Sequence, residues 1–290
     1  MHQRTQYLTV VFLILPAFAI VFFIAIYPMI YSFVISLEDF SITNPAAADF
    51  IWAQNYVELF LNDDRMRNAL FNTVSITAIA VTAELLLGLI LAFTFNQNFP
   101  GNGIMRSAIL MPMMTTSVCV GIIWRLIFNP TFGIANYFLS VLGLPPVLWL
   151  SDVNVALFAV SLADIWQWTP FMFLILFTGI RSLPVAPFEA AKIDGASNWQ
   201  LLRRLYLPML KRVILIAVIL RIIDVLKIFD IVYVMTKGGP AMSTDTVTMY
   251  IYRVSFDHFH TGYAAALSWV FLVIIMLVST VFIRYVRYAE

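Results

Sequence analysis

The chain has 290 residues, of which 62% are hydrophobic and only 11% are charged, and its mean hydropathy is +0.90. This composition excludes a soluble globular domain, which could not bury so much apolar surface, and predicts an integral membrane protein. The formal net charge of +1 gives no general attraction to nucleic acid, and the single cysteine, Cys119, excludes an internal disulfide and a cysteine metal site.

Six apolar stretches are long enough to cross about 30 Å of hydrocarbon as helices. They cover residues 8–37, 69–95, 104–128, 153–180, 212–236 and 264–284. Because lipid leaves no partner for open backbone groups, and these stretches are too long for barrel strands, the expected fold is an all-α bundle of six transmembrane helices. We expect an N-terminal span with an outer loop at 1–68 and a core transmembrane domain at 69–290.

The first stretch is predicted to be a retained span. No charged residue lies between Arg4 and Glu38, so the apolar run exceeds the core of a cleaved secretory signal, about 7–15 residues. Lys and Arg gather on the cytoplasmic side of membrane proteins. When the N-terminus is placed inside, ten Lys and Arg residues, the first Arg4 and the last Arg287, fall in the cytoplasmic segments, and four fall in the outer loops. Both termini are therefore expected in the cytoplasm.

The second and fourth stretches carry polar side chains that are costly in a membrane and are therefore candidates for function. In the second stretch, Glu84 is interpreted as a protonated or hydrogen-bonded packing residue in preference to a ligand contact, and Asn72 either caps the helix or faces a solute pathway. In the fourth stretch, Asp164, Gln167 and Trp168 share one helical face at i, i+3 and i+4.

The fourth stretch also holds Trp166 close to that face, and Pro170, which is expected to break the hydrogen-bond ladder of the helix near the middle of the membrane. Aromatic faces beside hydrogen-bonding groups suit a polyhydroxylated ligand, which has both apolar C–H faces and hydroxyls. Packing between helices, with indole N–H groups bonded to neighbours, explains the same residues, and the sequence leaves both explanations open.

The longest polar segment of the second half follows, within the loop at 182–211. Pro187 suits the first turn of a short helix and Gly195 suits its end, with the good helix formers FEAAKID between them. Ser197 and Gln200 have capping-box spacing for a second helix, which Pro208 is expected to end. The predicted hairpin either docks on a partner protein or lies as an amphipathic connector on lipid headgroups.

In the fifth stretch, Arg221, Asp224, Lys227 and Asp230 fall three residues apart, so on one helix they would drift around its surface. Buried ion pairs that fix the bundle are one explanation. A solute pathway is the other, and for it Asp230 and Tyr233, nearer the outer side, are the better candidates.

Several segments together resemble the permease subunits of binding-protein-dependent ABC importers. The loop matches their E-A-A…G…L-P signature, with Leu205 in place of the usual Ile and Leu202 in place of the usual Phe. The matched residues of the loop are Glu189, Ala190, Ala191, Asp194, Gly195, Ala196, Leu205, Leu207 and Pro208. Further matches are ALFNT (69–73), GIIWRLIFNPTFGIAN (121–136), WQWTPF (166–171) and TKGGPAMSTDTVTMYIY (236–252), which resemble the maltose and glycerol-phosphate type.

The resemblance implies a multi-pass inner-membrane protein of a bacterium or archaeon that works by alternating access. Its loop would dock on an ATPase subunit, and its partners would be a second permease, an ATPase dimer, a solute-binding protein outside and a sugar-like substrate. The chain has no G-x-x-x-x-G-K-[ST] phosphate loop, so ATP and magnesium would be bound by the ATPase subunits and not by this chain. The implied substrate pathway is assigned to Asn72, Trp166, Gln167, Trp168, Asp224, Lys227, Asp230 and Tyr233.

Two other classes of protein fit the composition. A stand-alone secondary transporter or channel would not need a capped cytoplasmic hairpin, and it would favour an inverted internal repeat, which the sequence does not display. An intramembrane enzyme would need a catalytic motif, and neither G-x-S-x-G nor H-E-x-x-H occurs. His258 and His260 supply two of the three or four ligands that a metal site needs, and a solvated loop explains them. No catalytic or metal-ligating residue is expected.

Overall fold

The computed structural model describes residues 15–97 and 99–288 of the chain. In these residues the regular elements are all helices, as expected for an all-α membrane protein. The chain forms two compact units, one built from residues 15–63 with Ile251–Val273 and the other from residues 64–250 with 274–288. The expected boundary between residues 68 and 69 stays a prediction.

The first unit consists of an N-terminal helix, the loop at residues 36–63 and the start of the last helix, with the segment that leads into it. Its helices are Leu15–Ile35, which contains the π-helical turn η1 (Phe22–Ile26) and α2 (Tyr27–Ile35), then α3 (Gln54–Leu61), the π-helical turn η5 (Arg253–Asp257) and the first part of α14 (Thr261–Tyr288). Asn55 donates to the backbone oxygens of Ser36 and Glu38, and Tyr263 donates to Asp63 at 2.6 Å. A Cβ on Gly262 would meet the Glu38 oxygen, so only glycine permits this close approach.

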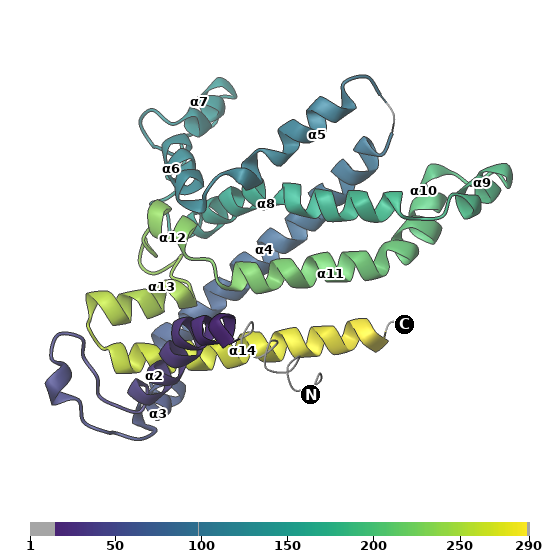
Figure 1. Ribbon diagram of the computed structural model, residues 1–290. Helices are drawn as coiled ribbons and strands as arrows, with labels where there is room; N and C mark the ends of the chain where they lie inside the picture. The colour runs from purple at the N-terminus through teal and green to yellow at the C-terminus, as the bar shows by residue number, and fades with distance from the viewer. Residues whose placement is uncertain (1–14, 98, 289–290) are drawn as a thin grey trace, which may run out of the picture. The chain divides into compact units, whose positions relative to one another are not determined.

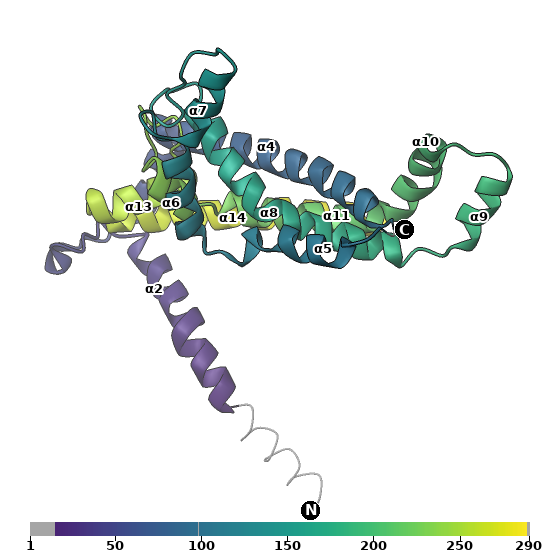
Figure 2. The same ribbon diagram turned by 90° about the horizontal axis from the view of Figure 1, so that it is seen from above.

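The second unit is a helical bundle in which α4, α8 and α11 run side by side (Figure 1). Its helices are α4 (Asp64–Phe95), α5 (Asn102–Leu110), α6 (Ser117–Ile127), α7 (Ile134–Val141), α8 (Ala156–Arg181), α9 (Ala186–Ile193), α10 (Asn198–Leu201), α11 (Leu207–Leu226), α12 (Asp230–Met235) and most of α13 (Val247–Tyr252). Figure 2 shows α9 and α10 beyond one end of the bundle, with α6 and α7 at the other end, where Figure 1 also shows α12.

The helices differ from the expected spans at two places. The third stretch is bent by 98° between Asn102–Met114 and Ser117–Ile127, because the chain turns at Thr115 and Thr116. The fifth stretch is not one helix: α11 ends at Leu226 and α12 begins at Asp230. Among the described residues, four helices are long and apolar enough to cross a bilayer, or five if the bent pair counts as one span. Residues 8–14 of the first expected span, with Arg4, lie outside the described residues.

One of two prolines inside helical segments, Pro208, does not act as the sequence predicted. Helix α8 continues through Pro170, with the residues on both sides helical. At Pro208 the second helix of the hairpin does not end. A π-helical turn, η4 (Leu202–Tyr206), joins α10 to α11, and the Leu207 N–H donates to the Leu202 oxygen. The wider turn accommodates a proline that cannot donate to the fourth residue before it, so helix α10 leads directly into the long helix α11.

Candidate coupling loop and solute pathway

The loop between α8 and α11 folds as the capped hairpin that the sequence predicted. Gly195 follows α9 with φ of +80°, which closes a Schellman motif: its N–H donates to the Lys192 oxygen, and the Ala196 N–H donates to the Ala191 oxygen at 2.9 Å. Ser197 then caps α10, with reciprocal hydrogen bonds between Ser197 and Gln200. The backbone groups at the two helix ends beside Gly195, the elbow of the hairpin, are therefore satisfied by partners three to five residues away in the chain.

The outer surface of this hairpin holds apolar side chains that nothing in the second unit covers. The side chain of Ile193 is 87% exposed and that of Trp199 is 67% exposed. Next to the elbow is a hollow of about 370 Å³, lined by Ala191, Asp194, Gly195, Ala196, Gln200, Leu201, Arg204 and Leu205. No atom lies within 4 Å of the place where a Gly195 side chain would begin. Small residues therefore leave the elbow open to an approaching surface.

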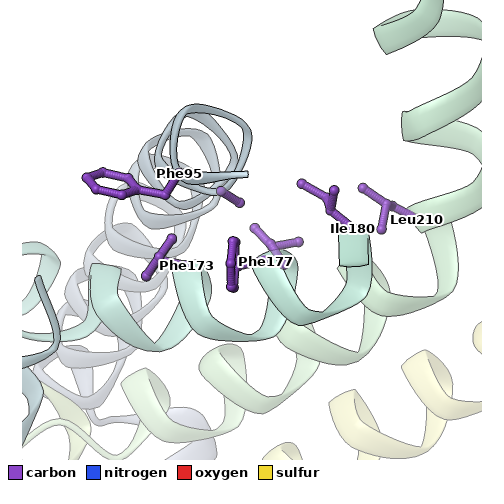
Figure 3. Close-up of a cluster of buried hydrophobic side chains, with 7 residues drawn as sticks. Phe95, Phe173, Phe177, Ile180 and Leu210 are labelled. Atoms are coloured by element: carbon purple, nitrogen blue, oxygen red, sulfur yellow. The ribbon is translucent and has the colours of Figure 1, made fainter. Parts of the chain in front are cut away.

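The base of the hairpin is packed firmly on the bundle. Phe188 of α9 is buried and its ring lies 4.3 Å from Tyr206, whose ring lies 5.1 Å from Phe93 of α4. Tyr206 also borders a buried cluster in which two side chains of α4, four of α8 and Leu210 of α11 meet (Figure 3). The base of the hairpin is therefore in contact with all three long helices.

Deeper in the bundle, Arg221 of α11 lies at the centre of a buried group of charges. Its guanidinium group donates to both oxygens of Glu84 at 2.7 Å, to Asp164 at 2.7 Å and to Asp224 at 2.6 Å. The Trp168 ring covers one face of the guanidinium at 4.9 Å. The interpretation of Glu84 as a hydrogen-bonded packing residue is thus confirmed, and its partner is Arg221, which joins α4, α8 and α11.

A polar pocket of about 130 Å³ lies beside this group, where α11 gives way to α12. At the break the N–H groups of Lys227 and Ile228 turn back to oxygens three residues earlier, and the Thr246 hydroxyl donates to the Ile228 oxygen at 3.2 Å. The pocket is lined by Ser117, Asp164, Trp168, Asp224, Val225, Lys227, Ile228, Phe229, Asp230 and Ile231. Irregular backbone is tolerated in a membrane protein where it lines a cavity, and the break between α11 and α12 lines this pocket.

Four of the eight predicted pathway residues line this pocket: Trp168, Asp224, Lys227 and Asp230. The other four lie outside it. Asn72 donates to the oxygens of Met242 and Asp245, Gln167 donates to the Thr115 oxygen, and Tyr233 stacks on Phe229 at 5.4 Å. Trp166 lines a separate, mainly apolar groove of about 610 Å³ between α5, α6 and α8.

Sequence reasoning did not assign Ser117 or Phe229 to the pocket, or Ile193 to the hairpin surface. Ser117 and Phe229 carry no charge, and only the bend before α6 and the break before α12 bring them to one place. Ile193 lies inside the recognised loop signature, so its apolar character at a polar surface was a signal that the sequence offered. The described residues include no group of His, Cys, Asp or Glu side chains placed to hold a metal ion.

These features define a class of protein: a helical membrane transporter component, with a polar pocket at a broken helix and a projecting hairpin on the same bundle. Residues 84–290 match the family described as "binding-protein-dependent transport system inner membrane component". The chain therefore belongs to this family, whose members are permease subunits of ABC importers that work by ATP-driven alternating access.

Individual relatives cover nearly the whole chain. A probable ABC transporter permease of Sinorhizobium fredii is 38% identical over 96% of this chain and 90% of its own length. The trehalose/maltose permease MalF of Thermococcus litoralis is 34% identical, over 95% and 92%. The sulfoquinovosyl glycerol permease SmoG of Agrobacterium fabrum is 35% identical, over 97% and 91%.

Solved structures show the same fold. A chain of a bacterial ABC transporter that imports the acidic polysaccharide alginate superposes with a TM-score of 0.84, at 20% identity, over 99% of this chain and 96% of that one. A second structure of an alginate transporter, in complex with a pentasaccharide-bound periplasmic protein, gives a TM-score of 0.78 at 21% identity, over 100% and 95%. At these identities the likeness concerns the fold and does not extend to the solute.

Proposed function

We propose that this chain is a permease subunit of a carbohydrate ABC importer in the plasma membrane of a bacterium or archaeon. The observation that carries the proposal is the polar pocket at the break between α11 and α12, where the Trp168 ring lies among charged side chains. An aromatic face with carboxylate acceptors and an ammonium donor matches the C–H faces and hydroxyls of a sugar. Relatives named for trehalose, maltose and sulfoquinovosyl glycerol support a sugar-like solute.

The proposed topology has six spans, with both termini and the hairpin in the cytoplasm. Helix α11 is the sixth proposed span, although it carries charged residues. Lys211 and Arg212 lie near its hairpin end, Arg221 is neutralised inside the bundle, and Asp224 faces the pocket, so these charges need not meet lipid. The excess of Lys and Arg in the segments assigned to the cytoplasm supports this orientation.

The hairpin is the proposed docking element for a separate ATPase subunit, which would bind ATP and magnesium. The loop residues assigned to it are Glu189, Ala190, Ala191, Asp194, Gly195, Ala196, Leu205, Leu207 and Pro208. The exposed Ile193 and Trp199 support a protein partner, because exposed apolar side chains together commonly mark an interaction surface. One hairpin serves one ATPase subunit, so the importer would hold this chain, a second permease, two ATPase subunits and a solute-binding protein outside.

Gly195→Asp tests the docking proposal. Positive φ at this position disfavours most side chains, and a partner surface at the elbow would exclude both added bulk and added charge. We expect the variant to reach normal abundance but to lose pull-down of the ATPase and hydrolysis stimulated by loaded binding protein. Gly101→Asp is the matched control, because Gly101 also has φ of +80° and open space around it but belongs to another loop.

The outcomes separate the alternatives. Equal ATPase recovery for Gly195→Asp and Gly101→Asp would favour a hairpin that lies on lipid. Uptake by this chain without its partners would favour a stand-alone secondary transporter. Sugar uptake that needs all the partners and fails with Gly195→Asp alone would support the importer.

A further inference from the structure

The charges around the pocket at the α11–α12 break are not balanced, and the imbalance bears on which solutes can pass. Three carboxylates line the pocket, those of Asp164, Asp224 and Asp230, against one ammonium group, that of Lys227. Asp224, Lys227 and Asp230 are exposed and belong to the segment where the helix is broken. The inference rests on the proposed function, in which the solute passes this pocket.

Arg221 offsets part of this negative charge but offers no free donor to an anionic solute. Its Nε and Nη2 atoms donate to the two oxygens of Glu84, Nη2 also donates to Asp164, and Nη1 donates to Asp224. The side chain is 1% exposed, and the Trp168 ring covers one face of the guanidinium group. A guanidinium group has five N–H bonds, and the four hydrogen bonds just described all go to carboxylate oxygens. An anionic solute therefore finds no open arginine here.

The formal charge of the whole group is negative. Four carboxylates, of Glu84, Asp164, Asp224 and Asp230, stand against two cations, Arg221 and Lys227, which gives −2. A narrow pocket concentrates the field of such a charge.

We propose that this pocket selects against acidic solutes and that the importer carries an uncharged, polyhydroxylated one. Hydroxyl groups would donate to the carboxylates of Asp224 and Asp230, the Lys227 ammonium would donate to a hydroxyl oxygen, and an apolar sugar face would lie on Trp168. A carboxylate, sulfonate or phosphate group would meet two exposed carboxylates and one cation, and juxtaposed like charges oppose binding.

Cysteine reactivity measures the potential in the pocket directly. Ser117 lines the pocket and is uncharged, so Ser117→Cys places a thiol there, and Cys119→Ser removes the exposed native thiol. The assembled importer in liposomes is treated with the trimethylammonium-ethyl and the sulfonato-ethyl methanethiosulfonate reagents, with a small free thiol as reference. We expect the ratio of cationic to anionic reaction rates to exceed that of the free thiol by about tenfold or more.

Two further variants are expected to change the ratio of cationic to anionic reaction rates in opposite directions. Asp230→Asn should move the ratio toward the free thiol, and Lys227→Met should raise it, and neither side chain belongs to the buried ion pairs of Arg221. A ratio equal to that of the free thiol, or no response to either variant, would overturn the inference. ATP-driven uptake of an acidic sugar at the rate of its neutral parent would also overturn it.

The same preparation separates this inference from the proposed function. Modification of Ser117→Cys should block uptake if the pocket lies on the solute pathway. If modification blocks uptake but the ratio of cationic to anionic reaction rates equals that of the free thiol, the pocket lies on the solute pathway but does not select by charge. If the cationic reagent is favoured but modification leaves uptake unaffected, the pocket does not lie on the solute pathway, and the conclusion about the solute fails with it.

Discussion

The hairpin and the charged pocket belong to the same unit but are stabilised in different ways. The hydrogen bonds that close the hairpin join residues three to five apart, such as Ala196 with Ala191 and Ser197 with Gln200. The bonds that hold Arg221 reach across 57 residues to Asp164 and 137 residues to Glu84. Local signals therefore determine the hairpin, whereas the charged group beside the pocket forms only when three long helices are packed together.

The difference suits the two proposed roles. A docking element must keep its shape while its outer surface remains open to a partner, and local caps permit that with few tertiary contacts. A solute pocket inside lipid must hold charged groups at fixed positions, and only partners on several helices can do so. The cluster of Phe95, Phe173, Phe177, Ile180 and Leu210 lies on the helices that join the two regions (Figure 3).

The largest effect is expected from Arg221→Met. Without the guanidinium group, Glu84 and Asp164 would remain buried with no cation, which costs about 3–5 kcal/mol when a buried pair is broken. We expect a strong loss of folded protein, measured as monodisperse yield in detergent and as the thermal unfolding midpoint. Lys211→Met, an exposed position on the same helix, is the control.

A compensating variant tests the cause. Glu84→Gln together with Asp164→Asn should recover part of the yield of Arg221→Met, because the uncompensated charges are then removed. If Arg221→Met alone were as stable as the Lys211→Met control, the contrast between a tertiary pocket and a local hairpin would fail.

The next effect concerns the approach of α4 to α8 that positions the pocket. A Cβ on Gly88 would lie 2.8 Å from the Met172 Cβ and 3.1 Å from the Phe173 nitrogen, so one of the two helices would have to shift. Overpacking of this kind costs about 1–3 kcal/mol. Gly88→Ala should lower the unfolding midpoint, whereas Gly103→Ala, with open space around it in α5, should leave it unchanged. Equal midpoints for the two variants would contradict the close packing.

The same contrast explains how much the sequence could predict. Pro187, Gly195 and the Ser197–Gln200 pair predicted both helices of the hairpin, because each signal acts within a few residues. The one local error was at Pro208, where a π-helical turn carries the helix through the proline. Such a turn has no residue signature that distinguishes it from a helix end.

The pocket could be predicted only in part. The spacing of Arg221, Asp224, Lys227 and Asp230 was interpreted on one continuous helix, but the helix ends at Leu226 and restarts at Asp230. No proline or glycine marks this break, and the Thr246 hydroxyl that bonds to the Ile228 oxygen lies 18 residues later. Glu84 was expected to be hydrogen-bonded, yet its partner could not be named without the packing of α4 against α11.

A smaller effect is expected at the aromatic wall of the pocket. Trp168 lines the pocket and covers Arg221, whereas Trp166, two residues earlier, packs in the separate groove with Trp124 at 6.2 Å. If Trp168 is the surface on which a sugar lies, Trp168→Ala should lose about 0.5–1.5 kcal/mol of interaction, roughly a two- to tenfold reduction in uptake. Uptake per assembled complex is the measurement.

Trp166→Ala is the control within the same helix and should leave uptake close to that of the wild type. A reduction by Trp166→Ala that equals or exceeds the one by Trp168→Ala would move the solute to the groove between α5, α6 and α8.

The smallest effect on global stability is expected from Ser197→Ala, which removes one half of the capping box at α10. The loss of such a cap costs about 1 kcal/mol of local helix stability. Because the hairpin is exposed and stabilised locally, it can open without the bundle, so the unfolding midpoint should stay nearly constant. Hydrogen exchange at residues 197–201 should rise about fivefold, which corresponds to that local free energy.

Ser182→Ala offers a matched change at the other end of the hairpin. The Ser182 hydroxyl donates to the Gly179 oxygen at the end of α8 and caps no helix N-terminus, so exchange in α10 should not respond to its loss. Because α10 continues through η4 into α11, the extent of the faster exchange is the decisive quantity. If Ser197→Ala accelerated exchange as far as Arg221, the hairpin and the pocket would open together. The hairpin would then not be an independent local element, and the distinction between the two regions would have to be abandoned.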